Sequence, residues 1–177
     1  MRGIVFANWI NEIPGENPIG AEVGVGSGNT SQTLLKTVPG IFLSLIDPWK
    51  TLPGGLDWDD GIHRDRYETA LESTRPWENQ REMIAQPSLE AVKKFSDKSL
   101  DFVLLDADHR PESVYDDCEA WWPKIKEGGF LGGRHYLRRI NGKNRGLEGV
   151  KLGVDQFAEE FWFNLILVGV SWKFLKG

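Results

Sequence analysis

Three closely spaced glycines form the most distinctive potential binding feature of the chain. The segment E-V-G-V-G-S-G-N-T begins at Glu22 and contains Gly24, Gly26 and Gly28. Alternating glycines allow a tight turn and let a ligand approach the backbone without obstruction by Cβ atoms. The dinucleotide fingerprint would need its third glycine where Asn29 stands, and no Lys-Ser/Thr pair follows as in a phosphate loop. Both differences disfavour a nicotinamide or phosphate ligand.

Glu22 indicates which charge the ligand carries. A carboxylate directly before the loop would repel a pyrophosphate that the loop and the following helix N-terminus attract. The same carboxylate suits a ligand with an ammonium group. A solvated or capping glutamate in an ordinary turn explains Glu22 alone equally well.

A second carboxylate, Asp47, ends the next apolar run, 19 residues after Gly28. This spacing resembles the roughly 20 residues that separate a glycine loop from a ribose-binding acid in nucleotide folds. Trp49 offers a flat apolar surface on which a purine could rest. Asp47 could also begin a turn before Pro48, and Trp49 could belong to the core. Together with the glycine loop, the pair favours a nucleoside ligand.

The segment Asp106-Ala107-Asp108-His109 could carry proton transfer, because it follows another apolar run. His109 has the intrinsic pKa of a general base near neutral pH. In the alternative interpretation, Asp108 and His109 only cap the helix that opens at Pro111. We favour catalysis, because the chain has only 3 histidines and this one follows a predicted strand.

Alternating strands and helices must position these residues. We expect an amphipathic lead-in at 1–18, with Ile4, Val5, Trp9 and Ile10 on one face. We expect strands at 19–25, 41–46, 81–85, 100–106 and 128–133, helices at 29–38, from 63 onward, 89–95, 111–122 and 154–163, and a strand pair within 165–175. Asn29 or Thr30 would cap the first of these helices and Ser88 a later one. The order predicts an α/β fold with a doubly wound, mostly parallel seven-stranded sheet, helices on both faces and a C-terminal antiparallel strand. Ligands of such sheets bind at the carboxyl ends of the strands.

Composition limits the class of protein. The 177 residues suit a single domain, and 21 Lys+Arg against 26 Asp+Glu give a net charge of -5, which disfavours non-specific nucleic-acid binding. The single cysteine excludes an internal disulfide framework and a multi-cysteine zinc site. With no apolar stretch of membrane-spanning length and no signal-peptide core, we expect a cytoplasmic protein without a membrane partner.

Four motifs in combination resemble the class I S-adenosylmethionine-dependent methyltransferases, which have a Rossmann-like fold. These are E-V-G-V-G-S-G-N-T-S, L-I-D-P-W, D-F-V-L-L-D-A-D-H and W-W-P-K-I-K-E-G-G-F-L-G-G. The chain is more narrowly similar to the small-molecule O-methyltransferase branch with macrocin-type and catechol-type enzymes. The resemblance covers Ile19 to the C-terminus and implies S-adenosyl-L-methionine as cofactor and S-adenosyl-L-homocysteine as product.

The resemblance also implies site residues. The methionine part of the cofactor would contact Gly24, Gly26, Ser27, Gly28 and Thr30, with Glu22 near its ammonium group. Asp47 would accept the ribose hydroxyls. The adenine would lie among Trp49, Gln86 and Ser88, although the family often has an acid where Gln86 stands. Asp106 would lie beside the methyl group, and Asp106 with His109 matches the D-x-x-H pattern of the macrocin-type branch.

Metal-assisted members of the family pair the first aspartate with D-D or D-N after the fifth strand. Here Arg134 and His135 occupy those positions. A guanidinium in place of an oxygen ligand opposes a hard Mg²⁺ ion, so we expect no metal. Instead, Arg134 would replace the metal's charge by gripping an anionic acceptor, with His135 as a second candidate base.

The acceptor site must be built from short loops. Residues 50–66, residues 134–152 or a second subunit of the chain would form the lid. The second loop carries six cations, which form either an anion-attracting rim or an ordinary solvated face: Arg134, Arg138, Arg139, Lys143, Arg145 and Lys151. We expect O-methylation of a small polar or anionic molecule. The alternatives are a cofactor-binding protein without catalysis and a nicotinamide-nucleotide-binding protein; a nucleic-acid methyltransferase is disfavoured, because no N-P-P-Y-type motif follows the fourth strand.

Overall fold

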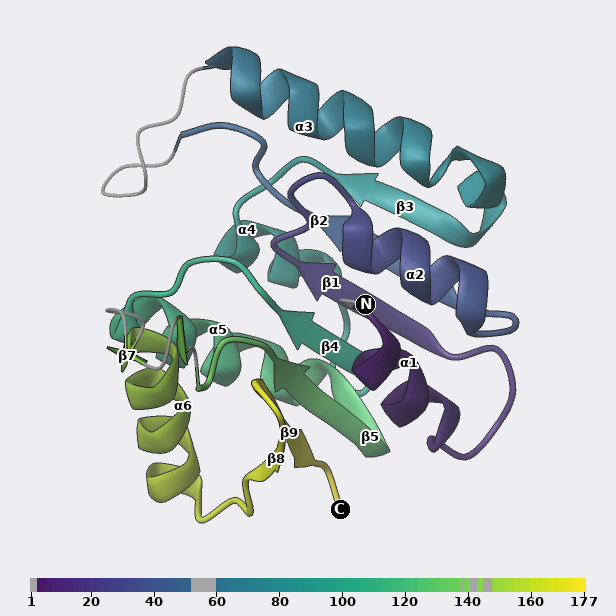
Figure 1. Ribbon diagram of the computed structural model, residues 1–177. Coiled ribbons are helices and arrows are strands. Elements are labelled where there is room, and N and C mark those ends of the chain that lie inside the picture. Colours follow the sequence, from purple (N-terminus) through teal and green to yellow (C-terminus); the bar gives the residue numbers. More distant parts are fainter. Residues whose placement is uncertain (1–2, 52–59, 138, 141–142, 145–147) are drawn as a thin grey trace.

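A seven-stranded sheet forms the centre of the protein in the computed structural model, which describes residues 3–51, 60–137, 139–140, 143–144 and 148–177 (Figure 1). Its strands are β1 (Ile19–Val23), β2 (Phe42–Ile46), β3 (Arg81–Ile84), β4 (Leu100–Leu105), β5 (Ile125–Gly133), β8 (Ile166–Val168) and β9 (Ser171–Leu175). They lie in the order β3-β2-β1-β4-β5-β9-β8. The first five are parallel, whereas β9 is antiparallel to both β5 and β8. The predicted fold class is confirmed.

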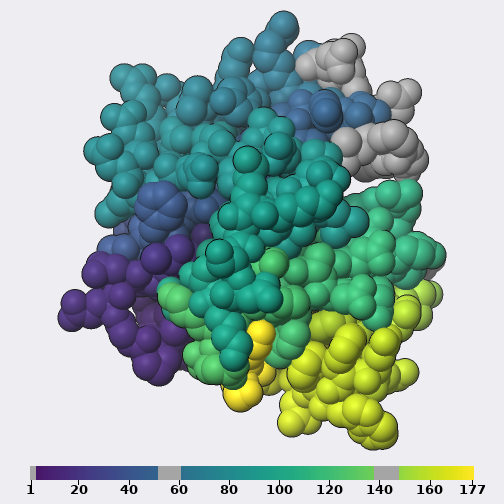
Figure 2. All heavy atoms as spheres, turned by 180° about the vertical axis from the view of Figure 1, so that it is seen from behind, coloured from purple at the N-terminus to yellow at the C-terminus, as the bar shows by residue number. Residues whose placement is uncertain are grey.

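Helices cover both faces of this sheet. The α-helices are α1 (Ile4–Asn11), α2 (Asn29–Thr37), α3 (Asp60–Ser73), α4 (Ser88–Ala91), α5 (Pro111–Trp121) and α6 (Glu148–Phe161). Short 3-10 helices follow three of them: η1 (Arg75–Gln80), η2 (Val92–Lys94) and η3 (Trp122–Lys124). Seen from behind, α6 and the β8-β9 hairpin lie at one end of the molecule and α3 at the other, as the strand order requires (Figure 2). None of the described helices is long and apolar enough to cross a membrane.

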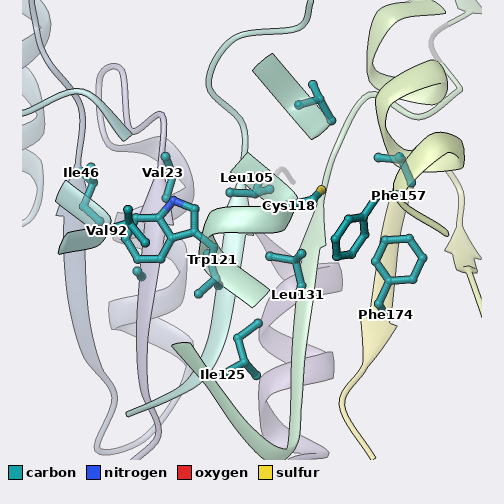
Figure 3. Packing of buried hydrophobic residues seen from close by; sticks show 14 of the residues in the cluster. Val23, Ile46, Val92, Leu105, Cys118, Trp121, Ile125, Leu131, Phe157 and Phe174 are labelled. Carbon is teal, nitrogen blue, oxygen red and sulfur yellow. The ribbon is translucent and has the colours of Figure 1, made fainter. Parts of the chain in front are cut away.

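Two buried clusters hold the helices against the sheet. The first joins β4, β5 and β9 to α5 and α6 and is centred on Trp121, which is fully buried. Figure 3 shows Trp121 near Val23 and Val92, with Phe157 of α6 beside Phe174 of β9. The second cluster packs α1, α2 and α3 against the opposite face. Because both faces are covered, the central strands β2 and β4 are largely apolar rather than alternating.

Several local predictions needed correction. The buried face of α1 includes Phe6 and Ala7 besides Trp9 and Ile10, so the lead-in is apolar around most of its circumference. The N-cap of α2 is Gly28 rather than Asn29 or Thr30, and no side chain caps this helix. The N-cap residue has a φ of 77°, a left-handed conformation that glycine adopts readily. Pro87 rather than Ser88 is the N-cap of α4.

The region after β5 also differs from the prediction. Helix α6 begins six residues before the expected Val154, at Glu148, because Gly149 and Gly153 pack closely against the backbone at His109 and Pro111. A small two-stranded sheet that was not predicted, β6 (Arg139–Ile140) with β7 (Lys143–Asn144), precedes the helix.

Candidate functional site

The register of the sheet brings four motifs to one edge. Val23 pairs with Ile46 on one side and with Leu105 on the other, and Leu105 pairs with Gly133. The next residue of each strand, namely Gly24, Asp47, Asp106 and Arg134, therefore follows at the same level. Strand order reverses between β1 and β4, where the loops diverge and leave room for a ligand.

The glycine loop between β1 and α2 lines a cavity of about 210 Å³. Its lining comes from the loop, from α2 and α3 and from the ends of β1, β4 and β5: Glu22, Gly24, Val25, Gly26, Ser27, Asn29, Thr30, Arg66, Asp106 and Arg134. Gly24 has a φ of 92°, and a Cβ there would collide with the backbone of Asp106. Gly28, which was predicted to contact the cofactor, is not among the lining residues and packs against Ala70 of α3.

Glu22 is 2% exposed and accepts a hydrogen bond from Ser31 Oγ at 2.5 Å. Burial raises the pKa of Glu22 to about 8, and the charges of Asp106 and Asp47 act in the same direction, while Ser31 opposes them. Burial therefore favours the neutral acid over the carboxylate at this position. An ammonium group arriving in the cavity would stabilise the ionised form of Glu22.

Asp47 joins the glycine loop to β2. Its Oδ2 accepts a hydrogen bond from Gly26 N at 2.9 Å, and its Oδ1 accepts one from Trp49 N at 2.7 Å. Burial raises the pKa of Asp47, although these two bonds oppose that rise. A carboxylate has about four acceptor positions, so Asp47 can accept hydrogen bonds beyond these two.

Trp49 is 8% exposed, donates from Nε1 to the carbonyl oxygen of Gly26 at 2.9 Å and meets the ring of Tyr67 edge-on at 5.0 Å. This arrangement makes Trp49 a support of the glycine loop and part of the core. Contact with adenine stays a prediction for this residue.

Gln86 and Ser88 follow β3 at the same edge of the sheet. Gln86 Oε1 is buried and makes no hydrogen bond within the described structure, so an acceptor is available for a ligand donor such as an amine. Ser88 Oγ donates to Asp117 Oδ1 at 2.5 Å and accepts from Trp121 Nε1 at 2.9 Å. The hydroxyl of Ser88 thus ties α4 to α5. Neither residue lines the 210 Å³ cavity.

Asp106, His109 and His135 form a compact cluster beside the cavity. Asp106 Oδ1 lies 3.5 Å from His109 Nε2 and 3.3 Å from His135 Nε2, and the ring centroids are 4.9 Å apart. Burial raises the pKa of Asp106, but the two imidazoles outweigh burial and hold it below its ordinary value. The arrangement can accept a proton and hold it near a carboxylate.

The two interpretations of Asp108 and His109 separate here. Asp108 accepts hydrogen bonds from the backbone N of Arg110 at 3.0 Å and from Ser113 Oγ at 3.1 Å, which makes it the residue that shapes the start of α5. His109 instead points to Asp106. Asp108 thus belongs to the start of α5, and the neighbouring His109 belongs to the cluster with Asp106.

Arg134 lines the cavity with Glu22 and Asp106. Its positive charge acts on Glu22 and lowers the pKa of that group, against the effect of burial. Of the other predicted cations, Lys151 pairs with Asp155. Parts of both predicted lid loops, 50–66 and 134–152, lie outside the described residues. These parts include Arg138 and Arg145.

Sequence reasoning missed Arg66. This residue of α3 lines the cavity and its charge lowers the pKa of Asp47. Only the start of that helix was predicted, and nothing in the local sequence distinguishes Arg66 from the neighbouring Arg64. The packing of Ala70 against Gly28 directs α3 toward the glycine loop.

Comparison with known proteins agrees with this arrangement. A sequence model described as "Methyltransferase domain" matches residues 21–133, from β1 to the end of β5. Comparison with curated protein sequences gives no match.

Solved structures with a similar fold cover nearly the whole chain. A Clostridium thermocellum protein assigned as an rRNA methylase has a TM-score of 0.67 at 13% identity, covering 100% of this chain and 98% of its own. A Staphylococcus aureus protein assigned as a caffeoyl-CoA O-methyltransferase has 0.65 at 15%, covering 98% and 90%. A Methanococcus maripaludis protein assigned as an S-adenosyl-L-methionine-dependent methyltransferase also has 0.65 at 15%, covering 98% and 84%. At these identities the likeness concerns the fold.

The family match spans the glycine loop, Asp47 and Asp106, which are the elements that the sheet register brings to one edge. The chain therefore belongs to the methyltransferase-domain family and is a class I S-adenosylmethionine-dependent methyltransferase.

Proposed function

We propose that the protein transfers a methyl group from S-adenosylmethionine to an oxygen atom of a small polar or anionic acceptor, with His109 as general base. The observation that carries this proposal is the position of the Asp106–His109–His135 cluster. It lies at the carboxyl end of β4, the strand beside β1, and shares Asp106 with the cavity formed by the glycine loop.

The cavity suits the amino-acid end of the cofactor. Its volume of about 210 Å³ is smaller than that of a complete pocket for a ligand of this size. Glu22 would face the ammonium group, while the backbone from Gly24 to Thr30 would surround the methionine part. The rest of the cofactor would extend along the strand ends, with ribose hydroxyls at Asp47 and the adenine amine donating to the unpaired Oε1 of Gln86.

Methyl transfer is an in-line displacement. The acceptor oxygen forms a bond to the methyl carbon while the carbon–sulfur bond breaks, so its electron pair stays on sulfur and S-adenosylhomocysteine leaves. The acceptor's proton would pass to the imidazole of His109, and Asp106 would stabilise the imidazolium that forms. His135 lies within the same cluster and would be the second proton acceptor.

Arg134 would select the acceptor. Arg134 follows the end of β5 and lines the cavity together with the glycine loop that would hold the cofactor. A carboxylate or phosphate on the acceptor would pair with the charge of Arg134 and thereby orient the hydroxyl.

The test uses His109→Ala with chemical rescue. Formation of S-adenosylhomocysteine is measured with a panel of catechols, hydroxy acids and sugar phosphates, and binding of S-adenosylmethionine is measured by calorimetry. We expect His109→Ala to keep cofactor affinity within about twofold, to lose about 100-fold or more in turnover and to regain part of it with added imidazole. Full activity of the variant removes His109 as the base. Transfer to nitrogen or sulfur acceptors alone, or to none, contradicts O-methylation.

A further inference from the structure

The Asp106–His109–His135 cluster has the donor atoms of a metal site as well as those of an acid–base pair. One carboxylate oxygen and two imidazole nitrogens, one from each residue, all lie within 4.8 Å of one another. Among the described residues, no other group of three histidine, cysteine, aspartate or glutamate side chains brings its ligand atoms this close together. None of the three side chains is fully exposed.

The distances between these atoms correspond to a shared ion. Oδ1 of Asp106 is 3.5 Å from Nε2 of His109 and 3.3 Å from Nε2 of His135. When zinc bonds of about 2.0–2.1 Å point to the corners of a tetrahedron, neighbouring ligand atoms lie about 3.3–3.4 Å apart. The distances from Asp106 match this spacing, and the three ligand atoms lie within 4.8 Å of one another, so a cation could contact Asp106 and both imidazoles once the side chains adjust.

His109 has an unsatisfied nitrogen in this cluster. Its Nε2 is buried and forms no hydrogen bond with any described residue. A buried nitrogen without a partner carries a free-energy cost that a bound ligand would remove. Oδ1 of Asp106 lies 3.5 Å from this atom, so a ligand placed between the two would contact both.

The backbone holds the second imidazole in place. His135 has a φ of 64°, a left-handed conformation that costs about 1 kcal/mol or more for a residue with a Cβ atom. The next residue fixes that turn, because Tyr136 N donates to Val170 O at 3.1 Å and Tyr136 Oη donates to Asp155 Oδ1 at 2.6 Å. The strained residue is therefore supported from the turn between β8 and β9 and from α6, as expected where a side chain must be held in one orientation.

We infer that Asp106, His109 and His135 bind one divalent first-row transition-metal ion, such as Zn²⁺, Co²⁺ or Ni²⁺, with open positions toward the cavity. Two neutral imidazoles and one carboxylate favour these borderline ions over Mg²⁺, which prefers oxygen ligands. The expected absence of a metal rested on Arg134 standing where an oxygen ligand of Mg²⁺ would be, whereas the imidazoles of His109 and His135 select a different class of ion.

The inference concerns the same cluster as the proposed function but does not depend on methyl transfer. An ion on Nε2 of His109 excludes a proton from that atom. Metal and base chemistry at His109 are therefore alternatives in any one molecule, and binding can be measured without cofactor or acceptor.

The experiment is a titration of the full chain, free of any affinity tag, with CoCl₂. Visible absorption reports the coordination, and calorimetry with ZnCl₂ reports affinity and stoichiometry. We expect one ion per chain and no saturable binding of MgCl₂ in the same range. His109→Ala and His135→Ala should each weaken Co²⁺ binding by at least about 100-fold, since even outer-shell changes cost 10–100-fold. Asp106→Asn should weaken it as well.

His63→Ala is the matched control. It removes the third histidine, which lies on α3 near Thr51 and outside the cluster, and it should bind Co²⁺ as the wild-type protein does. Absence of saturable Co²⁺ and Zn²⁺ binding overturns the inference, and so does equal binding by wild type and both cluster variants. Circular dichroism checks that each variant is folded. A chain that fails this titration yet methylates an acceptor leaves the proposed function standing, so the two failures are distinguishable.

Discussion

Gly26→Ala should separate cofactor binding from folding. Gly26 lines the cavity, has a φ of 55°, and an added Cβ would meet no atom within 4 Å. The protein itself therefore has space for the methyl group. A cofactor that approaches the loop backbone would compete for that space.

The stability cost follows from the backbone conformation. A residue with a Cβ in the left-handed region costs about 1–2 kcal/mol relative to glycine. In a domain of this size, each kcal/mol lowers Tm by about 2–4 °C, so we expect Tm to fall by about 2–8 °C. The hydrogen bond from Gly26 N to Asp47 can persist, because alanine keeps the backbone N–H. Affinity for S-adenosylhomocysteine should fall by at least about tenfold, which is about 1.4 kcal/mol.

Gly169→Ala provides the matched control. Gly169 lies in the exposed turn between β8 and β9, has a φ of 62°, and has equally open surroundings for a Cβ. Thermal unfolding and calorimetry with S-adenosylhomocysteine should show a similar fall in Tm for both variants and a loss of affinity for Gly26→Ala alone. Unchanged affinity of Gly26→Ala would refute close approach of the cofactor to this loop. A much larger fall in Tm for Gly26→Ala than for Gly169→Ala would show that the loop has no room for a Cβ atom at Gly26.

Three other substitutions test the same edge of the sheet. Glu22→Gln keeps an acceptor for Ser31. The pKa of wild-type Glu22 is about 8 in the folded protein and 4.5 in the unfolded chain, so the folded state loses stability as the pH rises between these values. In urea titrations, the free energy of unfolding of the wild type should fall relative to that of the variant by about 1.4 kcal/mol per pH unit. The same variant should lose affinity for S-adenosylmethionine but keep it for 5′-methylthioadenosine, which lacks the ammonium group; equal losses would contradict the assignment of Glu22. Asp47→Asn removes one of two backbone acceptors, so calorimetry should show weaker binding of both compounds, and unchanged binding of either would contradict a ribose role. Gly24→Ala places a Cβ against the backbone of Asp106 and should lower Tm more than Gly26→Ala does; an equal Tm would show that the β1–β4 junction can open.

The fold was largely predictable because the central strands are mostly apolar runs that end at turn residues. The runs before Gly24, Asp47 and Asp106 end where the structure ends β1, β2 and β4 to within two residues. Helix boundaries were predicted less well where tertiary contacts set them. Helix α6 begins at Glu148 because two of its glycines fit against the backbone near His109 and Pro111, a contact between distant segments.

The sequence predicted which side chains would lie near the site, but not which groups they would hydrogen-bond to. Ser88 was expected to cap its own helix, yet its hydroxyl bonds to Asp117 and Trp121, 29 and 33 residues away. Trp49 supports the glycine loop through the carbonyl of Gly26, 23 residues before it. Local sequence indicates that a serine or tryptophan is available, but the packing of helices decides which group it meets.

The sequence alone determined which residues stand at the ends of the parallel strands, because hydrophobic runs and turn residues are local properties. Glu22, the glycine loop, Asp47 and Asp106 follow from that information. The tertiary structure decided that His135 joins Asp106 and His109, since this depends on the pairing of β5 with β4 and on a strained turn held by Tyr136. It also brought Arg66 to the cavity and buried Glu22 enough to raise its pKa to about 8. Burial and long-range pairing arise only when the whole chain is packed, and they set the electrostatic and coordination chemistry of this site.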